Sequence, residues 1–186
     1  MRKVAGVLLA AAMVAPMSLM ASPAQAATGL TCAKLTGNVT WTPALPKLGN
    51  KTLVKAKIVA KGSFSGCKGT PGITSGAFTF TELPSAKGTN CNAFTVKNAA
   101  PTFASVVVKW NNGKTSTAAK TTVKVLGLQG TSGIVQTIGK TTSGTVFKGE
   151  TSTATTIFKP SGGGCVTAAL TKATVSLKAG TKVVIK

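Results

Sequence analysis

Few side chains in this sequence can carry out chemistry, and those that most enzymes rely on are missing. The chain has no histidine, tyrosine or aspartate, so a nucleophile activated by histidine has no base. Its two carboxylates, Glu82 and Glu150, could in principle flank a sugar bond, but both have lysines nearby and are interpreted as surface carboxylates. Serine and lysine are too abundant for a Ser–Lys dyad to be located. We therefore expect no catalytic residues and no enzyme activity.

Four cysteines are the next candidates: Cys32, Cys67, Cys91 and Cys165. No two of them form a C-x-x-C arrangement and the chain has no histidine, so we expect no metal site. An even number of cysteines in an exported chain favours two disulfides. Three pairings are open to four cysteines. The preferred one is Cys32–Cys67 with Cys91–Cys165, because it closes each half of the chain without crossing.

Two glycine-rich stretches have the composition of phosphate-binding loops but not their spacing. Gly133 to Thr141 ends in Gly-Lys-Thr, yet five residues separate Gly133 from Gly139 where the phosphate loop has four. Ser161 to Gly164 lacks the lysine, and neither stretch precedes a predicted helix. Both are interpreted as ordinary loops, and no cofactor is expected.

The charge of the chain is extreme. It has 22 lysines and arginines against 2 acidic residues. Without Arg2 and Lys3, 20 lysines remain against the two glutamates, a net charge of +18. Such a charge attracts polyanions and also keeps a protein soluble. The polyanions considered are a cell-wall polymer, a surface glycan, anionic lipid and nucleic acid. The densest basic run is Lys51, Lys55, Lys57 and Lys61, the predicted polyanion contact.

Sequence-specific recognition of nucleic acid is not expected. Base readout favours arginine, and none remains after Arg2. Stacking on bases needs exposed aromatic rings, whereas Trp41 and Trp110 each end an alternating apolar face and are predicted core residues.

The first 26 residues have the three features of a secretory signal peptide. Arg2 and Lys3 provide a positive start, Val4 to Ala15 is a short apolar run, and Ala24-Gln25-Ala26 matches a cleavage site. Residues 1–26 are thus predicted to be a signal peptide and residues 27–186 a single domain. No later stretch is long and apolar enough for a membrane helix. The protein is expected to be secreted, and either released or held at the cell surface.

The strongest local pattern is a hairpin from Phe103 to Val125. Ala104, Val106, Val108 and Trp110 occupy alternate positions, as in a strand with one buried face. Asn111 to Lys114 then supplies the Asn and Gly that tight turns favour. The chain returns through residues rich in β-branched side chains.

Similar patterns predict nine to eleven short strands and no helix. A first strand over Leu35–Trp41 is expected to end at Pro43, and a second covers Lys51–Lys61 with its lysines on the outer face. A brief strand is predicted around Phe94 to Lys97. Turn signals about every ten residues indicate a sandwich or barrel, and the fold class chosen is an antiparallel β-sandwich of the Ig-like or Greek-key type. A membrane β-barrel fits less well, because the strands are short and tyrosine is absent.

The chain resembles uncharacterised small secreted all-β proteins of actinobacteria. The likeness rests on the Ala-rich leader ending at Ala26, on Cys32 followed by Gly37 to Pro43, on Lys109-Trp110-Asn111, and on the region from Gly144 to Cys165. It implies export and a β architecture, and it implies no activity.

The expected function is a secreted, non-catalytic protein associated with the cell envelope through lysine contacts with anionic polymers. The alternative is an extracellular binding module for a specific protein or an apolar ligand.

Overall fold

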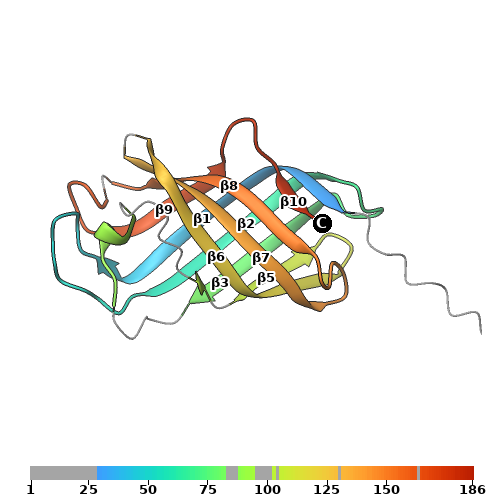
Figure 1. Cartoon of the computed structure of the whole chain (residues 1–186), viewed down its shortest axis with the longest axis horizontal. Coiled ribbons are helices and arrows are strands. Elements are labelled where there is room, and N and C mark those ends of the chain that lie inside the picture. The colour runs from blue at the N-terminus through green and yellow to red at the C-terminus, as the bar shows by residue number, and fades with distance from the viewer. Residues whose placement is uncertain (1–28, 83–87, 95–101, 104, 130, 163) are drawn as a thin grey trace, which may run out of the picture.

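The computed structural model describes residues 29–82, 88–94, 102–103, 105–129, 131–162 and 164–186 (Figure 1). The predicted signal peptide, residues 1–26, lies outside this part of the chain, as do residues 95–97 of a predicted strand.

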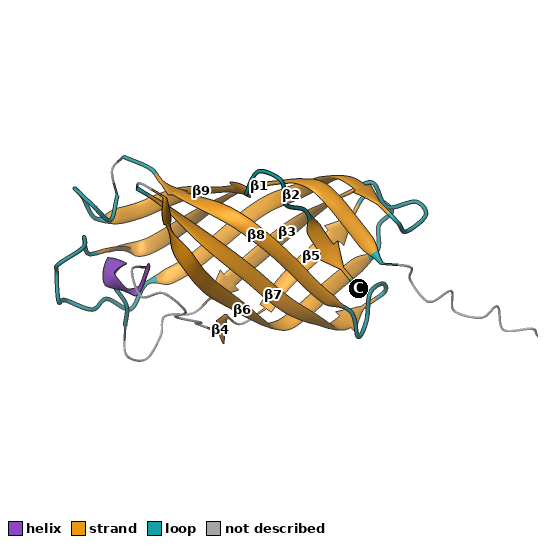
Figure 2. Ribbon diagram, turned by 45° about the horizontal axis from the view of Figure 1, so that its top comes forward, coloured by secondary structure: helices purple, strands orange, loops and turns teal. Residues whose placement is uncertain are grey.

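Eight antiparallel strands pair in sequence order and close into a barrel, as Figure 2 shows. Each strand pairs with the next, and the last pairs with the first along Thr36–Leu45. The barrel strands are β1 (Leu30–Leu45), β2 (Lys57–Lys68), β3 (Ser75–Glu82), β5 (Ser105–Trp110), β6 (Thr115–Gln129), β7 (Ser132–Gly144), β8 (Thr151–Pro160) and β9 (Leu170–Leu177).

Three short elements complete the fold. Strand β4 (Thr102–Phe103) pairs with β6. Strand β10 (Val183–Ile185) pairs with both β1 and β8. At one end of the barrel, which we call the β10 end, it thus lies in the wall between these two strands, where β9 lies further along. The 3-10 helix η1 (Cys91–Phe94) lies at the opposite end, called the η1 end (Figure 1).

The predicted β-sandwich is therefore wrong, although the all-β antiparallel class and the two disulfides are confirmed. The physical reason is the length of β1. Its 16 residues pair with β2 on one side and with β9 and β10 on the other, so the sheet has no free edge at which to split into two layers. Turn spacing along the sequence does not distinguish two stacked sheets from one closed sheet.

Several predicted strand boundaries also differ. Pro43 lies within β1 rather than after it, at a register shift between Thr40 and Leu45, where a missing N–H removes no ladder hydrogen bond. Strand β2 begins at Lys57, so the first six residues of the predicted Lys51–Lys61 strand precede it.

Two further segments were assigned the wrong conformation. Gly133 to Thr141, interpreted as a loop, belongs to β7 and pairs with both β6 and β8. Phe94, predicted to begin a strand, is the last residue of η1.

The central hairpin is confirmed. Strand β5 runs to Trp110, the turn spans 111–114, and β6 begins at Thr115. Val106, Val108 and Trp110 all face the interior, as the alternation predicts.

The core consists of two clusters, one at each end of the barrel. At the β10 end, Leu30, Trp110, Phe147 and Ile185 pack around the Cys32–Cys67 disulfide. At the η1 end, the cluster is built around the Cys91–Cys165 disulfide from the side chains of Val39, Trp41, Leu45, Phe158 and Leu170. Both predicted core tryptophans are thus buried.

Glycines make room for one of the interior rings. Gly62 on β2 lies opposite Gly37 on β1, and the Phe78 ring lies against both residues. A Cβ on Gly62 would lie 2.5 Å from Phe78 Cζ and would also meet the backbone oxygen of Thr36.

Gly62→Ala is expected to lower the free energy of unfolding by roughly 1–3 kcal/mol, because the added methyl group has no space. The matched control is Gly133→Ala in β7, whose Cβ would lie at an ordinary 3.8 Å from Phe158 and should change stability by less than about 0.5 kcal/mol. Urea denaturation measures both. Equal losses in the two variants would contradict the packing described for Phe78.

Candidate ligand-binding cavity

A cavity of about 250 Å³ lies inside the barrel. Its lining comes from the inward positions of all eight barrel strands and of β10, and it includes members of both end clusters. Small side chains keep it open. Gly37, Ala60, Ala118 and Ala154 occupy inward positions on β1, β2, β6 and β8, where larger side chains would fill the space.

One part of the lining is aromatic. Phe64 on β2 stacks on Trp110 with ring centroids 5.9 Å apart, and it contacts Phe78 on β3 at 5.2 Å. Trp110 in turn meets Phe147 edge to face at 5.5 Å. Its indole Nε1 donates a hydrogen bond of 2.7 Å to Ser116 Oγ, which fixes the ring. This side offers a rigid apolar surface to a ligand.

The lining contributed by β6, β7 and β8 carries hydroxyl groups. These are Ser116, Thr121, Thr137, Thr141, Ser152, Thr153 and Thr156. Thr121 is 4% exposed, and its Oγ1 is buried without a hydrogen-bond partner. A buried hydroxyl without a partner costs free energy, and few exist in native proteins.

Every residue that lines the cavity is uncharged. The two carboxylates lie at opposite ends of the barrel: Glu82 ends β3 at the η1 end, and Glu150 precedes β8 at the β10 end. The structure therefore does not bring them together as a catalytic pair.

Glu82 continues the inward-facing row of Phe78 and Phe80 on β3. Burial raises its pKa from 4.5 to about 7, and its Oε2 has no hydrogen-bond partner. The folded protein consequently holds this proton at pH values where the unfolded chain has released it.

Stability should therefore fall as the pH rises from about 4.5 to 7, because in that window the folded state binds more protons than the unfolded state. Glu82 is half-buried, so after solvent screening we expect a loss of about 1 kcal/mol. Glu82→Gln should remove this loss. Thermal unfolding of both proteins at several pH values measures it, and the same pH slope in both would contradict the assignment.

The predicted polyanion contacts are all exposed but do not share one strand. Lys57 and Lys61 lie on the outward face of β2, while Lys51 and Lys55 precede that strand. Among the lysines that the structure describes, only Lys124 is half-buried and the others are exposed. The positive charge is thus distributed over the outside of the barrel.

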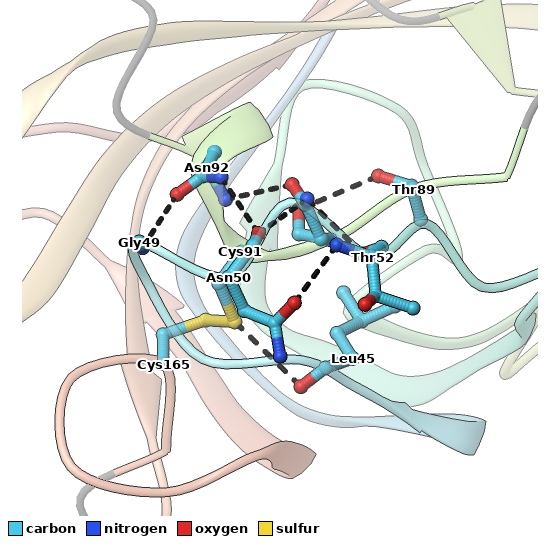
Figure 3. The surroundings of a disulfide bond; sticks show 9 residues. Leu45, Gly49, Asn50, Thr52, Thr89, Cys91, Asn92 and Cys165 are labelled. Carbon is cyan, nitrogen blue, oxygen red and sulfur yellow. Dashed lines mark hydrogen bonds between the residues drawn. A yellow bond between two sulfur atoms is a disulfide. The ribbon is translucent and has the colours of Figure 1, made fainter.

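The η1 end is held together by three loops (Figure 3). The Cys91–Cys165 disulfide joins η1 to the loop between β8 and β9. Both loops bind the segment after β1, since Cys91 N–H donates to Pro46 O at 3.1 Å and Leu48 N–H donates to Cys165 O at 2.7 Å.

Asparagine side chains complete this network. Asn90 Nδ2 donates to the carbonyl oxygens of Asn50 and Thr52 at 2.9 and 3.2 Å, and Asn92 Oδ1 accepts from Gly49 N–H at 3.0 Å (Figure 3). The disulfide therefore belongs to a cross-linked cap over this end of the barrel. The Cys32–Cys67 disulfide joins neighbouring strands β1 and β2 at the other end.

Within the described ranges, no group of three or more His, Cys, Asp or Glu side chains could hold a metal ion. The same part of the chain contains no helix long and apolar enough to cross a membrane.

Sequence reasoning did not find the cavity. The sequence does contain a sign of it, because small or hydroxyl-bearing residues such as Ala118 and Thr121 occupy inward positions of β6. These positions are hard to recognise in the sequence, because a bulge between Ala118 and Thr121 interrupts the alternation of inward and outward residues. Comparison with known proteins adds no assignment: the chain matches no protein-family model, no curated protein and no solved structure.

Proposed function

We propose that this protein is a secreted, non-catalytic barrel that binds a small apolar molecule in its interior. The observation that carries the proposal is the uncharged, largely apolar cavity of about 250 Å³ between the two end clusters. Barrels of eight strands have an interior that is either filled by side chains or holds one small ligand. Here the interior is incompletely filled. An apolar interior also differs from the interior of a water-filled pore, which is polar.

The lining leaves room for further packing contacts. Larger residues at Ala60, Ala118 or Ala154 would fill part of this space. A ligand that occupies it gains contacts with the lining instead. As a scale, a cavity of about 150 Å³ takes benzene, so this one should take roughly ten non-hydrogen atoms.

Naphthalene, with its ten carbon atoms, tests the proposal. Equilibrium dialysis of the oxidised protein against naphthalene should show saturable binding of one molecule per chain. The double variant Ala60→Leu/Ala118→Leu adds six carbon atoms to the lining and should weaken binding at least tenfold.

The matched control is Ala77→Leu/Ala119→Leu, which places the same side chains on the exposed faces of β3 and β6. It should bind naphthalene as the wild type does. The absence of saturable binding to the wild type, or equal loss in both double variants, would contradict an interior site.

Attachment to anionic cell-wall polymer through lysines is a second candidate function. It is favoured by the exposure of nearly all described lysines, including Lys51, Lys55, Lys57 and Lys61. Location outside the cell is supported by the two disulfides. Retention on purified cell envelope should be lost by a few hundred millimolar salt if the contacts are electrostatic. Absence of retention at low salt would rule out this second candidate. It would not bear on the proposal that the interior binds an apolar ligand.

A further inference from the structure

We propose that the ligand carries one uncharged hydrogen-bonding group, such as a hydroxyl or a carbonyl, and that Thr121 binds this group. The inference rests on the proposed function, because it concerns the same cavity. It adds the chemical class of the ligand and the place in the barrel to which the polar group of the ligand is directed.

Thr121 lies on β6 and lines the cavity. It is 4% exposed, and Oγ1 has no partner, although a threonine hydroxyl can donate one hydrogen bond and accept two. The neighbouring hydroxyl of Ser116, by contrast, accepts the indole N–H of Trp110. A ligand group that pairs with Thr121 would satisfy a buried polar atom that nothing else in the described chain satisfies.

A glycine lies directly beside Thr121 in the neighbouring strand. Gly139 on β7 pairs with Thr121 on one side and with Ser152 of β8 on the other. A Cβ on Gly139 would lie 3.1 Å from Thr121 Oγ1 and 3.3 Å from Ser152 Oγ. A side chain at position 139 would therefore crowd both hydroxyl groups, and the glycine lets both lie against the backbone of β7.

Ser152 can provide a second contact. Its Oγ donates a hydrogen bond of 3.0 Å to the carbonyl oxygen of Gly139, which leaves its lone pairs free to accept. A ligand hydroxyl within reach of both groups can accept the proton of Thr121 and donate its own to Ser152. A ligand carbonyl can accept from Thr121 alone.

The bound group must be uncharged. No lysine, arginine or glutamate is among the residues that line the cavity, so a carboxylate or ammonium group would be desolvated without a counter-ion. The apolar remainder of the ligand would contact the aromatic part of the lining around Phe64, Phe78 and Trp110. The class is thus a compact alcohol, phenol or ketone of roughly ten carbon atoms.

Three probes of one shape test the inference: naphthalene, 2-naphthol and 2-naphthoate, each measured by equilibrium dialysis at pH 7. For the wild type we expect 2-naphthol to bind about tenfold more tightly than naphthalene, and 2-naphthoate to bind least. Thr121→Val has nearly the same shape without the hydroxyl. It should abolish the preference for 2-naphthol over naphthalene, because the hydroxyl that distinguishes the two probes is gone.

Two further variants control for structure. Thr121→Ser keeps the hydroxyl and should retain the preference for 2-naphthol. Thr122→Val makes the same replacement on the opposite face of β6 and should bind all three probes as the wild type does.

The outcomes separate this inference from the proposed function. If naphthalene and 2-naphthol bind equally and Thr121→Val changes neither, the inference is wrong and the interior site stands. If 2-naphthoate binds as tightly as 2-naphthol, the uncharged class is wrong. If none of the probes binds the wild type, the proposed function itself fails.

Discussion

Trp110→Ala is expected to lower the free energy of unfolding by about 4 kcal/mol, the usual cost of removing a buried tryptophan. Trp110 is 4% exposed and stands between Phe64 and Phe147 in the cluster at the β10 end. Truncation leaves a void beside an existing cavity and removes the donor that binds Ser116. Urea denaturation followed by circular dichroism measures the loss.

Trp110→Phe serves as the control for this prediction. It keeps an aromatic ring at this position but loses three ring atoms and the hydrogen bond to Ser116, so its cost should be smaller than that of the alanine variant, about 1–2 kcal/mol. A loss below about 1 kcal/mol in the alanine variant would show that the aromatic cluster is not a main source of stability, contrary to the core described here.

Removal of the Cys91–Cys165 disulfide by the double variant Cys91→Ala/Cys165→Ala should cost about 4 kcal/mol. The bridge spans 74 residues, and in the chain-entropy model a loop of this length restricts the unfolded state strongly. It also ties η1 to the loop after β8 within the cap at the η1 end. Urea denaturation again provides the measurement.

Amide hydrogen exchange separates the cap from the barrel in this variant. In the variant, we expect the backbone amides of Leu48 and of residue 91, which donate hydrogen bonds across the cap, to lose protection first. The comparison is Cys32→Ala/Cys67→Ala, in which the ladder between β1 and β2 still holds the two segments together. A wild-type midpoint of denaturation in the Cys91→Ala/Cys165→Ala variant would contradict a structural role for the bridge.

The local structure of this chain was more predictable than its closure. The hairpin that contains Trp110 follows from period-two alternation and an Asn-Gly turn, both of which act over a few residues. Closure depends on whether β1 pairs with β9, more than 120 residues away. No residue type signals that pairing, because threonine and valine suit the edge of a sandwich and the seam of a barrel equally.

The candidate site was not predictable for a related reason. The cavity depends on which small residues meet across the closed barrel, for example Gly139 beside Thr121 and Ser152. Along the sequence these residues are an ordinary glycine, threonine and serine in polar strands. The lack of histidine and aspartate, in contrast, is visible in the sequence without the fold, because no arrangement of the chain can supply a residue that the sequence does not contain.

The most direct test of the interior site is nuclear magnetic resonance of the protein with naphthalene, in which methyl groups on both faces of the barrel serve as reporters. The account predicts nuclear Overhauser effects from naphthalene protons to Val106, Val108 and Val135, which line the cavity. It predicts none to Val107 and Ile138, which are exposed on the outer face. Contacts with Val107 or Ile138 alone would place the ligand outside the barrel and contradict the proposal.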